Sequence, residues 1–350
     1  MIDCIQCNTN PAAACFTLCT DCLRAYPHPD NLVRLHARAR EKYGLVSVPP
    51  DSDDGIPCAL CANRCRMGEG ERGYCGIRAN QGGELKELVP AGSALAHAYL
   101  DRLPSNCCAA WFCQGSRDCQ GSREQGYNLA VFFYGCSFDC FYCQNAGHKF
   151  LDDAPRMTEG ELVQKAMGRT VRCVCFFGGT PEPQMSFALR AAERIARESG
   201  GTRRICWEWN GTADPRLAVK AAELSKETGG TVKFDLKAFT PALHLALCGA
   251  GNQRTLANFR MLAGRYAGEE LVTAVTLLVP WYVDAREVAG IASIIAEVDP
   301  AMPYSLLVFH PDFLMDDLPV TPREQVHACR DAARKHLSRV NIGNRQLLQG

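Results

Sequence analysis

A short cysteine-bearing stretch in the first half of the sequence decides the fold of this chain. It reads Tyr134-Gly135-Cys136-Ser137-Phe138-Asp139-Cys140-Phe141-Tyr142-Cys143-Gln144-Asn145. The apolar run at 128–135 predicts a β-strand, which places three thiols on one loop at the end of that strand. A cubane iron–sulfur cluster has four irons, so three cysteines would leave one iron free to bind an exogenous chelate, such as the amine and carboxylate of an amino acid. The stretch therefore predicts a reactive metal site on a strand-end loop.

The residues around and after this loop predict a repeated strand–helix pattern. From Tyr127 onward, apolar β-rich runs alternate with segments of helical periodicity, which is typical of a parallel sheet. We expect six strands, at 128–135, 171–177, 203–209, 231–236, 271–279 and 304–309. Helix starts are indicated by two capping boxes and two prolines at first helical positions, in Thr158 with Glu161, Thr321 with Glu324, Asp214 before Pro215, and Pro322. Six such units predict an α/β fold, a partial (β/α)6 barrel with its active site at the carboxyl ends of the strands.

The first 125 residues differ in kind from the rest. They are rich in Cys, Gly, Pro and Asn, and show one clear helical pattern, at 31–43. We therefore divide the chain into a Cys-rich, loop-rich metal-binding region at 1–125 and a barrel at 126–350. The chain has 21 cysteines. Because thiols in a reducing compartment do not persist as disulfides, their clustered short spacings indicate metal or iron–sulfur ligation.

The spacing of the central cysteines, three residues and then two, resembles the radical S-adenosylmethionine (SAM) superfamily. After the second strand, the stretch Gly178-Gly179-Thr180-Pro181-Glu182 resembles the glycine-rich motif of that superfamily, although two residues separate its acid from its glycines. Two further strand ends, Asp235-Leu236-Lys237 and Phe309-His310-Pro311, resemble those of the glycyl-radical-enzyme activases. Over about 127–344 the chain is most similar to the activating-enzyme-like subgroup.

The resemblance implies a cofactor set and a reaction. It implies that Cys136, Cys140 and Cys143 are the catalytic cysteines and ligate a [4Fe–4S] cluster. It implies SAM-binding roles for Tyr142, Gly178, Gly179, Thr180, Glu182, Asn210, Asp235, Lys237 and His310. The implied activity is that of an oxidoreductase that cleaves SAM reductively and abstracts hydrogen from a protein or peptide substrate, with glycyl radical activation as one example. A low-potential electron donor, flavodoxin or ferredoxin, is the implied partner.

Three further groups of cysteines precede the barrel. In the first group we expect Cys4 and Cys7 to pair with Cys19 and Cys22 as a tetrahedral zinc knuckle, with four protein ligands and hence a structural role. The second group suits zinc, a single iron or an auxiliary cluster and comprises Cys58, Cys61, Cys65 and Cys75. The third lies in a loop that a buried metal would stabilise and comprises Cys107, Cys108, Cys113 and Cys119. The other barrel cysteines, at 173, 175, 206, 248 and 329, are expected to pack in the core.

Composition excludes other classes of function. The 38 basic and 38 acidic residues give zero net charge, so the chain lacks the overall field that attracts nucleic acid or an anionic membrane, and neither is an expected partner. The longest uncharged apolar run, 271–283, is shorter than the roughly 18 residues that span a bilayer. With no basic signal-peptide start, the sequence predicts a cytoplasmic protein. Two alternatives stay open: a multi-cluster electron-transfer or iron-sensing protein without SAM turnover, and a radical SAM enzyme acting on a small molecule or RNA.

Overall fold

A computed structural model describes the backbone of residues 1–119 and 126–349 and the side chains within those ranges except at 118, 119 and 349. The predicted ligand Cys119 therefore lies outside the residues whose side chains are described. Within the described ranges, no helix is both long enough and apolar enough to cross a bilayer.

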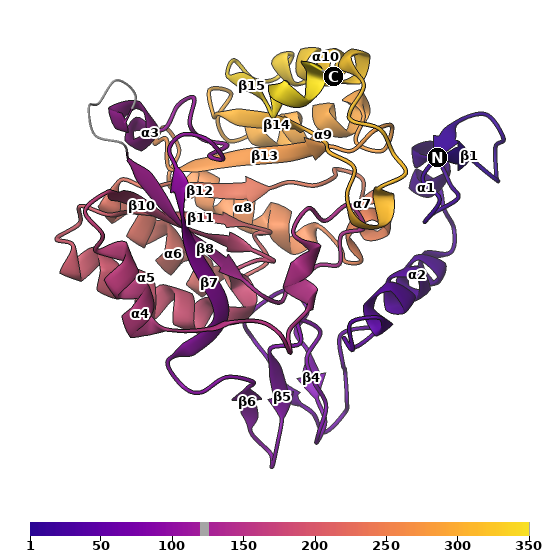
Figure 1. Cartoon of the computed structure of the whole chain (residues 1–350). Helices are drawn as coiled ribbons and strands as arrows, with labels where there is room; N and C mark the ends of the chain where they lie inside the picture. Colours follow the sequence, from indigo (N-terminus) through magenta and orange to yellow (C-terminus); the bar gives the residue numbers. More distant parts are fainter. Residues whose placement is uncertain (120–125, 350) are drawn as a thin grey trace.

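A curled, nine-stranded sheet forms the centre of the molecule (Figure 1). Its parallel strands are β8 (Tyr127–Phe133), β10 (Val171–Gly178), β11 (Arg204–Trp209), β12 (Val232–Asp235), β13 (Val272–Leu278), β14 (Tyr304–Val308) and β15 (Val340–Gly343). They lie in the order β15-β14-β13-β12-β11-β10-β8. The six predicted strands are thus confirmed, each within two residues at either end. Their carboxyl ends meet at one edge, as a partial barrel requires.

Three strands of the sheet were not predicted. The seventh parallel strand, β15, is short and half-buried, so its sequence carries little of the apolar signal by which strands are recognised. On the other side of the sheet, β7 (Ser93–Arg102) pairs antiparallel with β8, and β9 (Arg156–Thr158) pairs antiparallel with β7. The sheet therefore begins within the segment 1–125.

Helices cover the outer face of the sheet. In Figure 1, α4 (Glu159–Ala166), α5 (Met185–Glu198), α6 (Pro215–Thr228) and α8 (Gln253–Arg265) pack one against the next, and α9 (Ala285–Ala296) packs on α10 (Arg323–Arg334). The capping box of Thr158 and Glu161 is confirmed, and Asp214 caps α6 by accepting a hydrogen bond from the Arg216 amide.

The predicted cap at Thr321 is wrong. Helix α10 begins at Arg323 and has no side-chain cap. The buried Thr321 hydroxyl instead donates to the Leu278 carbonyl at 2.7 Å and accepts from the Phe309 amide at 2.8 Å. It joins the ends of β13 and β14, because those backbone groups are buried and would otherwise have no partner.

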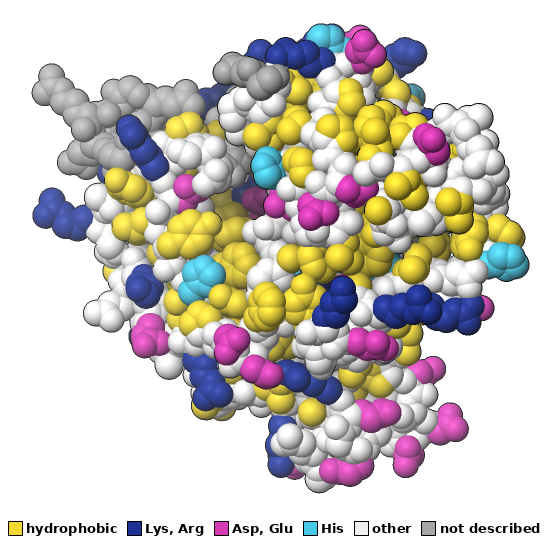
Figure 2. Space-filling view, turned by 45° about the vertical axis from the view of Figure 1, so that its right-hand side comes forward, with side chains coloured by type: hydrophobic (Ala, Val, Ile, Leu, Met, Phe, Trp, Pro, Cys, Tyr) yellow, Lys and Arg dark blue, Asp and Glu magenta, His cyan; other side chains and the backbone are white. Residues whose placement is uncertain are grey.

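The amino-terminal region forms two parts on the barrel (Figure 1). One part contains β1 (Ile2–Asp3), β2 (Pro11–Ala12), α1 (Thr20–Arg24) and α2 (Pro29–Glu41), the last matching the predicted helix. The other contains β3 (Ile56–Pro57), β4 (Arg66–Met67), β5 (Arg78–Asn80) and β6 (Leu85–Glu87), and acidic side chains gather on its surface in Figure 2. The short α3 (Gln114–Cys119) follows β7.

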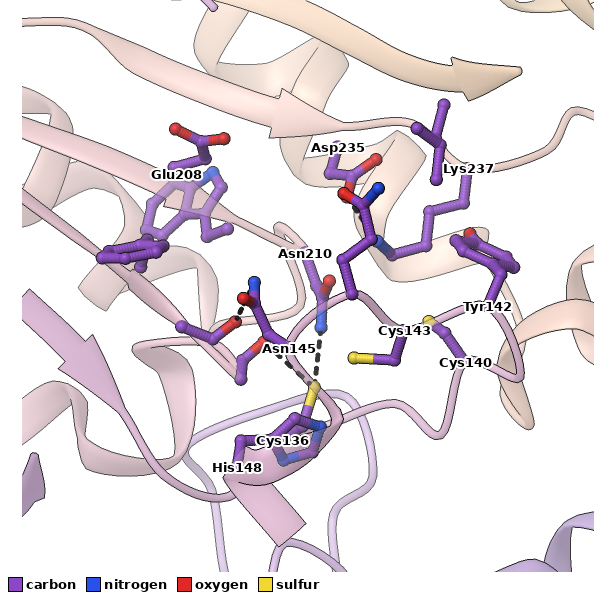
Figure 3. Close-up of a pocket in the computed structure, with 16 residues that line it drawn as sticks. Cys136, Cys140, Tyr142, Cys143, Asn145, His148, Glu208, Asn210, Asp235 and Lys237 are labelled. Carbon is purple, nitrogen blue, oxygen red and sulfur yellow. Dashed lines mark hydrogen bonds and ion pairs between the residues drawn. The ribbon is translucent and has the colours of Figure 1, made fainter. Parts of the chain in front are cut away.

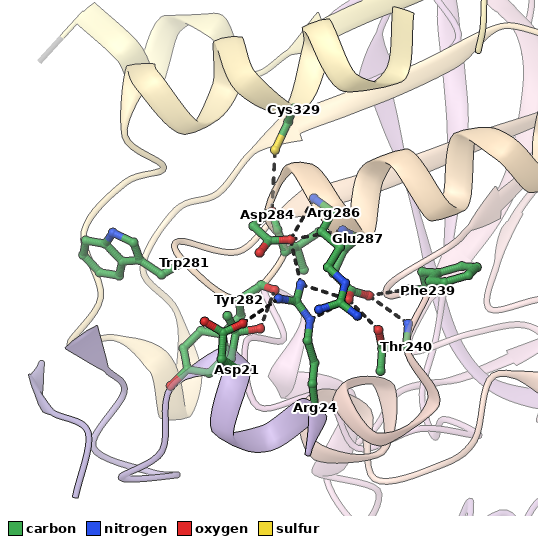
Figure 4. A network of polar contacts seen from close by, with 12 residues as sticks. Asp21, Arg24, Phe239, Thr240, Trp281, Tyr282, Asp284, Arg286, Glu287 and Cys329 are labelled. Atoms are coloured by element: carbon green, nitrogen blue, oxygen red, sulfur yellow. Dashed lines mark hydrogen bonds and ion pairs between the residues drawn. The ribbon is translucent and has the colours of Figure 1, made fainter. Parts of the chain in front are cut away.

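A buried polar network fixes α1 to the barrel (Figure 4). The Arg24 guanidinium contacts Asp284 at 2.7 Å and Glu287 at 3.0 Å. The fully buried Glu287 carboxylate also accepts from the Phe239 and Thr240 amides, both at 2.8 Å. The network therefore links the amino-terminal unit to the loop that follows Asp235 and Lys237.

Candidate active site

A hollow opens where the carboxyl ends of the strands meet. Most of the residues predicted to bind SAM line it, as Figure 3 shows. These are Cys136, Cys140, Cys143, Tyr142, Gly178, Gly179, Asn210, Asp235 and Lys237.

Three thiols stand together on one wall of this hollow. Cys136 Sγ lies 3.3 Å from Asn210 Nδ2 and 3.4 Å from the Phe138 amide, and both groups donate to it. Burial raises the pKa of the Cys136 and Cys143 thiols to about 12. Without a metal both thiols therefore carry protons, and metal binding must displace them.

Cys248 lies behind these thiols. Its Sγ is fully buried, 3.6 Å from the Tyr142 hydroxyl, and outside the residues that line the hollow. Hydrogen bonding with Cys248 lowers the pKa of Cys140. Cys248 was predicted to pack in the core, and its position next to Cys140 gives that packing a local electrostatic effect.

The glycine pair after β10 forms a cradle that no side chain could enter. Gly178 has a φ of +113°, and a Cβ there would meet the Phe133 amide nitrogen at 2.5 Å. A Cβ on Gly179 would meet the Gly135 carbonyl oxygen at 2.3 Å and the His148 ring at 2.9 Å. Only glycine allows this close backbone approach, and it leaves room for a ligand above the loop.

Asp235 and Lys237 form a partly buried ion pair that also lines the hollow. Burial by itself would lower the pKa of Lys237, but the charges of Asp235 and Cys140 raise it well above its ordinary value. The ammonium lies 6.0 Å from the centre of the Tyr142 ring. A fixed positive charge therefore stands beside the thiols, where it can pair with the carboxylate of a bound ligand.

Three predicted SAM-binding residues do not line the hollow. Thr180 and Glu182 are buried beneath the glycine pair, where Glu182 accepts from the Thr212 amide at 2.9 Å and from the Thr180 hydroxyl. Burial raises the pKa of Glu182. His310 is exposed at the surface, 3.2 Å from Asp312. Gly178 and Gly179 line the hollow, whereas Glu182, the acid of the predicted motif, does not.

His148 lines the hollow and was not predicted. It is buried, its Nδ1 has no hydrogen-bond partner among the described residues, and burial lowers its pKa to about 3. A buried polar atom of this kind indicates a site whose ligand supplies the missing partner. His148 lies five residues after Cys143 and packs against Gly179, but no motif of the sequence marks it.

Asp139, inside the cysteine loop, is a further residue that sequence reasoning missed. It is fully buried and contacts His36 at 2.9 Å, Arg40 at 3.6 Å and Lys149. Burial alone would raise its pKa, but the hydrogen bond with His36 and the nearby cations hold it well below its ordinary value. Since His36 and Arg40 belong to α2, the amino-terminal region holds the cysteine loop from behind.

A second set of thiols lies deeper in the barrel. Lys233 Nζ lies 3.3 Å from Cys175 Sγ and 3.3 Å from Glu208 Oε2, and Glu208 also lines the hollow. The charge of Lys233 acts as well on Cys107, Cys108 and Cys206. Cys175 and Cys206, predicted to pack in the core, thus share a polar cluster with the third cysteine group. Side chains alternate between the two faces along a strand, so Cys206 and Glu208 were to be expected on the same face. This alternation was the sequence signal that could have indicated the polar cluster.

The first cysteine group has the geometry predicted for it. Sγ atoms of Cys4 and Cys22 lie 3.7 Å apart, and those of Cys7 and Cys19 lie 3.8 Å apart. In the described part of the chain it is the only group of three or more His, Cys, Asp or Glu residues with all ligand atoms within 4.8 Å of one another. Cys15, which is close to these residues in the sequence, is not part of the group.

Comparisons with known proteins agree with this geometry. Residues 130–286 match the family model of the radical SAM superfamily. An uncharacterized protein of Methanocaldococcus jannaschii is 25% identical over 299 residues, covering 83% of this chain and 82% of its own.

Two solved structures are also similar. A domain of pyruvate-formate lyase-activating enzyme from Bacteroides vulgatus is 19% identical, with a TM-score of 0.40, over 49% of this chain and 98% of that one. A radical SAM methyltransferase from Sphaerobacter thermophilus is 17% identical, with a TM-score of 0.46, over 61% of this chain and 66% of that one. The family match spans the cysteine loop, the glycine pair and the Asp235–Lys237 wall of the hollow, so the residues that form this site are similar to the radical SAM superfamily.

Proposed function

We propose that this protein is an oxidoreductase of the activating-enzyme type, which cleaves SAM reductively and abstracts hydrogen from a protein or peptide substrate. One observation carries the proposal. Cys136, Cys140 and Cys143 face a hollow that, among the described residues, no fourth cysteine lines. A [4Fe–4S] cluster held there keeps one iron for an outside ligand.

The residues present fit that cofactor pair. Three thiols supply the protein ligands, the glycine pair leaves space beside them, and His148 offers an unpaired nitrogen. When bound, the cluster and SAM supply one-electron cleavage of a carbon–sulfur bond and a 5′-deoxyadenosyl radical.

The chain's own residues bind the ligand, orient the groups around it and exclude water. Lys237 is placed to pair with the carboxylate of a bound amino acid, and Asp235 holds the ammonium in position. Asn210 orients the Cys136 thiolate by donating to it. Buried walls exclude water, which protects a reactive radical from side reactions.

The rim of the hollow supports a substrate presented by another chain. Gln144 and Asn145 on the rim are exposed, whereas Tyr142 and His148 below them are buried. An extended peptide segment can therefore reach the hollow without opening the barrel. The electron donor we propose is a low-potential protein such as flavodoxin or ferredoxin.

The test is anaerobic reconstitution with iron and sulfide, followed by dithionite and SAM. We expect 5′-deoxyadenosine by mass spectrometry, and none from the variant in which Cys136, Cys140 and Cys143 are all alanine. A reconstituted wild type that carries its iron yet forms no 5′-deoxyadenosine would overturn the proposal and favour an electron carrier. A matched control is Cys329→Ala, which removes a buried thiol far from the hollow.

A further inference from the structure

The second cysteine group encloses a space of its own. Cys58, Cys61, Cys65 and Cys75 line one small hollow, together with apolar Leu60, Met67 and Pro183 and with the polar residues Asn63, Arg64 and Arg78. The Tyr74 amide donates to Cys65 Sγ at 3.4 Å. Four thiols around one small space, with a backbone donor to sulfur, suit an iron–sulfur site.

The spacing of these thiols differs from that of the first group. A single tetrahedral zinc with bonds of about 2.3 Å holds its sulfurs about 3.8 Å apart, which matches the 3.7 and 3.8 Å of the first group. No three of the four thiols of the second group, all of them described, lie mutually within 4.8 Å, and the same is true of Cys136, Cys140 and Cys143. In a cubane each thiolate binds a different iron, so the four sulfurs stand farther apart than around one ion. The second group therefore shares its wider spacing with the cysteines of the radical site.

The second group also lies directly against the radical site. Asn63, between Cys61 and Cys65, donates from Nδ2 to the Ser137 carbonyl at 2.9 Å, and Ser137 follows Cys136. The Ala62 amide donates to the Thr212 carbonyl at 2.9 Å. Thr212 in turn hydrogen-bonds the Ser137 hydroxyl at 2.8 Å. A short path of bonds and hydrogen bonds thus joins the two sets of cysteines.

A second contact reinforces this junction. A Cβ on Gly135 would lie 2.9 Å from the carbonyl oxygen of Cys75, so the backbones of the two segments touch immediately before Cys136. Arg40 bridges the same two segments: it stacks 3.5 Å from the centre of the Tyr74 ring and approaches Asp139 at 3.6 Å.

The opposite side of the second group is open to solvent. Cys58 and Cys61 are half-buried and also line a surface hollow with Arg64, Asp214 and Arg254. A donor protein can therefore approach these thiols from outside, while their inner side contacts the barrel.

The geometry points to a second, fully protein-ligated [4Fe–4S] cluster on Cys58, Cys61, Cys65 and Cys75, which passes electrons from an external donor to the radical site. The relay rests on the proposed function, whereas the cluster itself does not. One electron leaves a low-potential donor protein and reduces the second cluster. The same electron then moves to the radical site, so the second cluster returns to its oxidised state and no proton or leaving group is involved.

The cluster is tested in a protein whose radical site has been removed. The variant with Cys136, Cys140 and Cys143 changed to alanine is reconstituted anaerobically and desalted. We expect about four irons and four sulfides per chain, and after dithionite an electron paramagnetic resonance signal of a reduced [4Fe–4S] cluster. Zinc in place of iron, or no metal beyond the first group, would overturn the assignment. This measurement needs no substitution in the second group and no SAM chemistry.

The relay is tested with the complementary variant, Cys58→Ala/Cys61→Ala. We expect it to keep about four irons at the radical site, and to form 5′-deoxyadenosine with titanium(III) citrate but lose that activity with reduced flavodoxin or ferredoxin. The Cys15→Ala/Cys329→Ala variant, which removes as many thiols elsewhere, should use both reductants like the wild type. Equal activity of the Cys58→Ala/Cys61→Ala variant with both reductants would refute the relay. If the wild type forms no 5′-deoxyadenosine with either reductant, the proposed function fails while the iron count of the second cluster stands.

Discussion

Two groups of cysteines in this chain differ in how completely they can enclose a metal. Cys4, Cys7, Cys19 and Cys22 approach one point from four sides, and among the described residues theirs are the only such ligand atoms mutually within 4.8 Å. Cys136, Cys140 and Cys143 stand wider apart and face an open hollow. A closed set of four ligands stabilises a fold, whereas three ligands beside open space allow chemistry.

The difference is maintained by what lies around each group. The first group is carried by short strands and one short helix, whose buried apolar side chains belong to the core of the barrel. The barrel cysteines are held by a sheet, by the glycine cradle and by Asp139 with its cationic neighbours. We therefore expect the order of the first region to depend more on a bound metal than that of the second region does.

The largest expected effect follows from removing the first group. In the variant Cys4→Ala/Cys7→Ala we expect loss of one metal ion per chain and protease sensitivity within residues 1–24, because a structural metal supplies the folding energy of such a unit. Metal analysis and limited proteolysis measure both. Cys15→Ala is the control and should keep the ion. Loss of the ion from Cys15→Ala would show that the wrong cysteines have been assigned.

The junction between the two regions should be nearly as sensitive. Arg24→Leu leaves the fully buried Glu287 without its cation, and removing one partner of a buried ion pair costs about 3 kcal/mol or more. Denaturant unfolding measures the loss. Arg216→Ala, at an exposed ion pair with Asp214, should leave stability unchanged. Equal midpoints for wild type and Arg24→Leu would mean that the network in Figure 4 does not join the regions.

A pH effect is expected at the helix between them. α7 (Pro241–Cys248) packs on both α1 and α2, and burial lowers the pKa of its His244 from 6.5 to about 4. The unfolded chain takes up this proton first as the pH falls, so the stability contributed by neutral His244 is complete above about pH 6.5 and is lost toward pH 4. The stability lost between these two pH values amounts to about 3 kcal/mol.

Substituting His244 by a residue that does not titrate tests this. The acid-dependent loss of stability between pH 6.5 and 4 should be smaller in His244→Gln than in the wild type. His310→Gln, at an exposed ring, should follow the wild-type profile. If His244→Gln and the wild type lose stability in parallel, the buried ring is not the source of the effect.

A substitution at Gly179 tests how tightly the backbone is packed at the open site. Gly179→Ala places a methyl group 2.3 Å from the Gly135 carbonyl oxygen, and overpacking of this kind costs about 1–3 kcal/mol. Thermal unfolding of the protein without cofactors isolates this cost. Gly160→Ala is the matched control, because a Cβ there meets nothing within 4 Å and the residue lies in α4. An unchanged melting temperature in Gly179→Ala would show that the loop accommodates the added methyl group at little cost in stability.

The smallest expected effect concerns the fourth thiol near the open site. Cys248→Ala should retain the full iron content after reconstitution, because Cys248 lies behind the cysteine loop and outside the hollow. Loss of iron in this variant would contradict the comparison itself. It would mean that the barrel site is closed by a fourth cysteine.

Most of the barrel and the centre of its site could be predicted from sequence. The six strands carry strong apolar runs, and the three cysteines share one loop, so covalent spacing alone brings them together. The glycine pair was recognised for the same reason. Thr180, Glu182 and His310 were assigned by the same local logic, but the structure places them outside the hollow, because a motif fixes the order of residues and not the direction of side chains.

What the sequence by itself determined is therefore everything that depends on neighbours along the chain: strand faces, the cysteine loop and the knuckle spacing. Tertiary structure decided the contacts between distant segments. It brought Gly179 against His148, His36 to Asp139 over 103 residues, and Lys233 to Cys175 over 58. It also placed the second cysteine group against Ser137. The physical reason is that contacts between distant residues depend on how the whole sheet curls and on which elements pack against it. The spacing of residues along the chain does not encode these contacts.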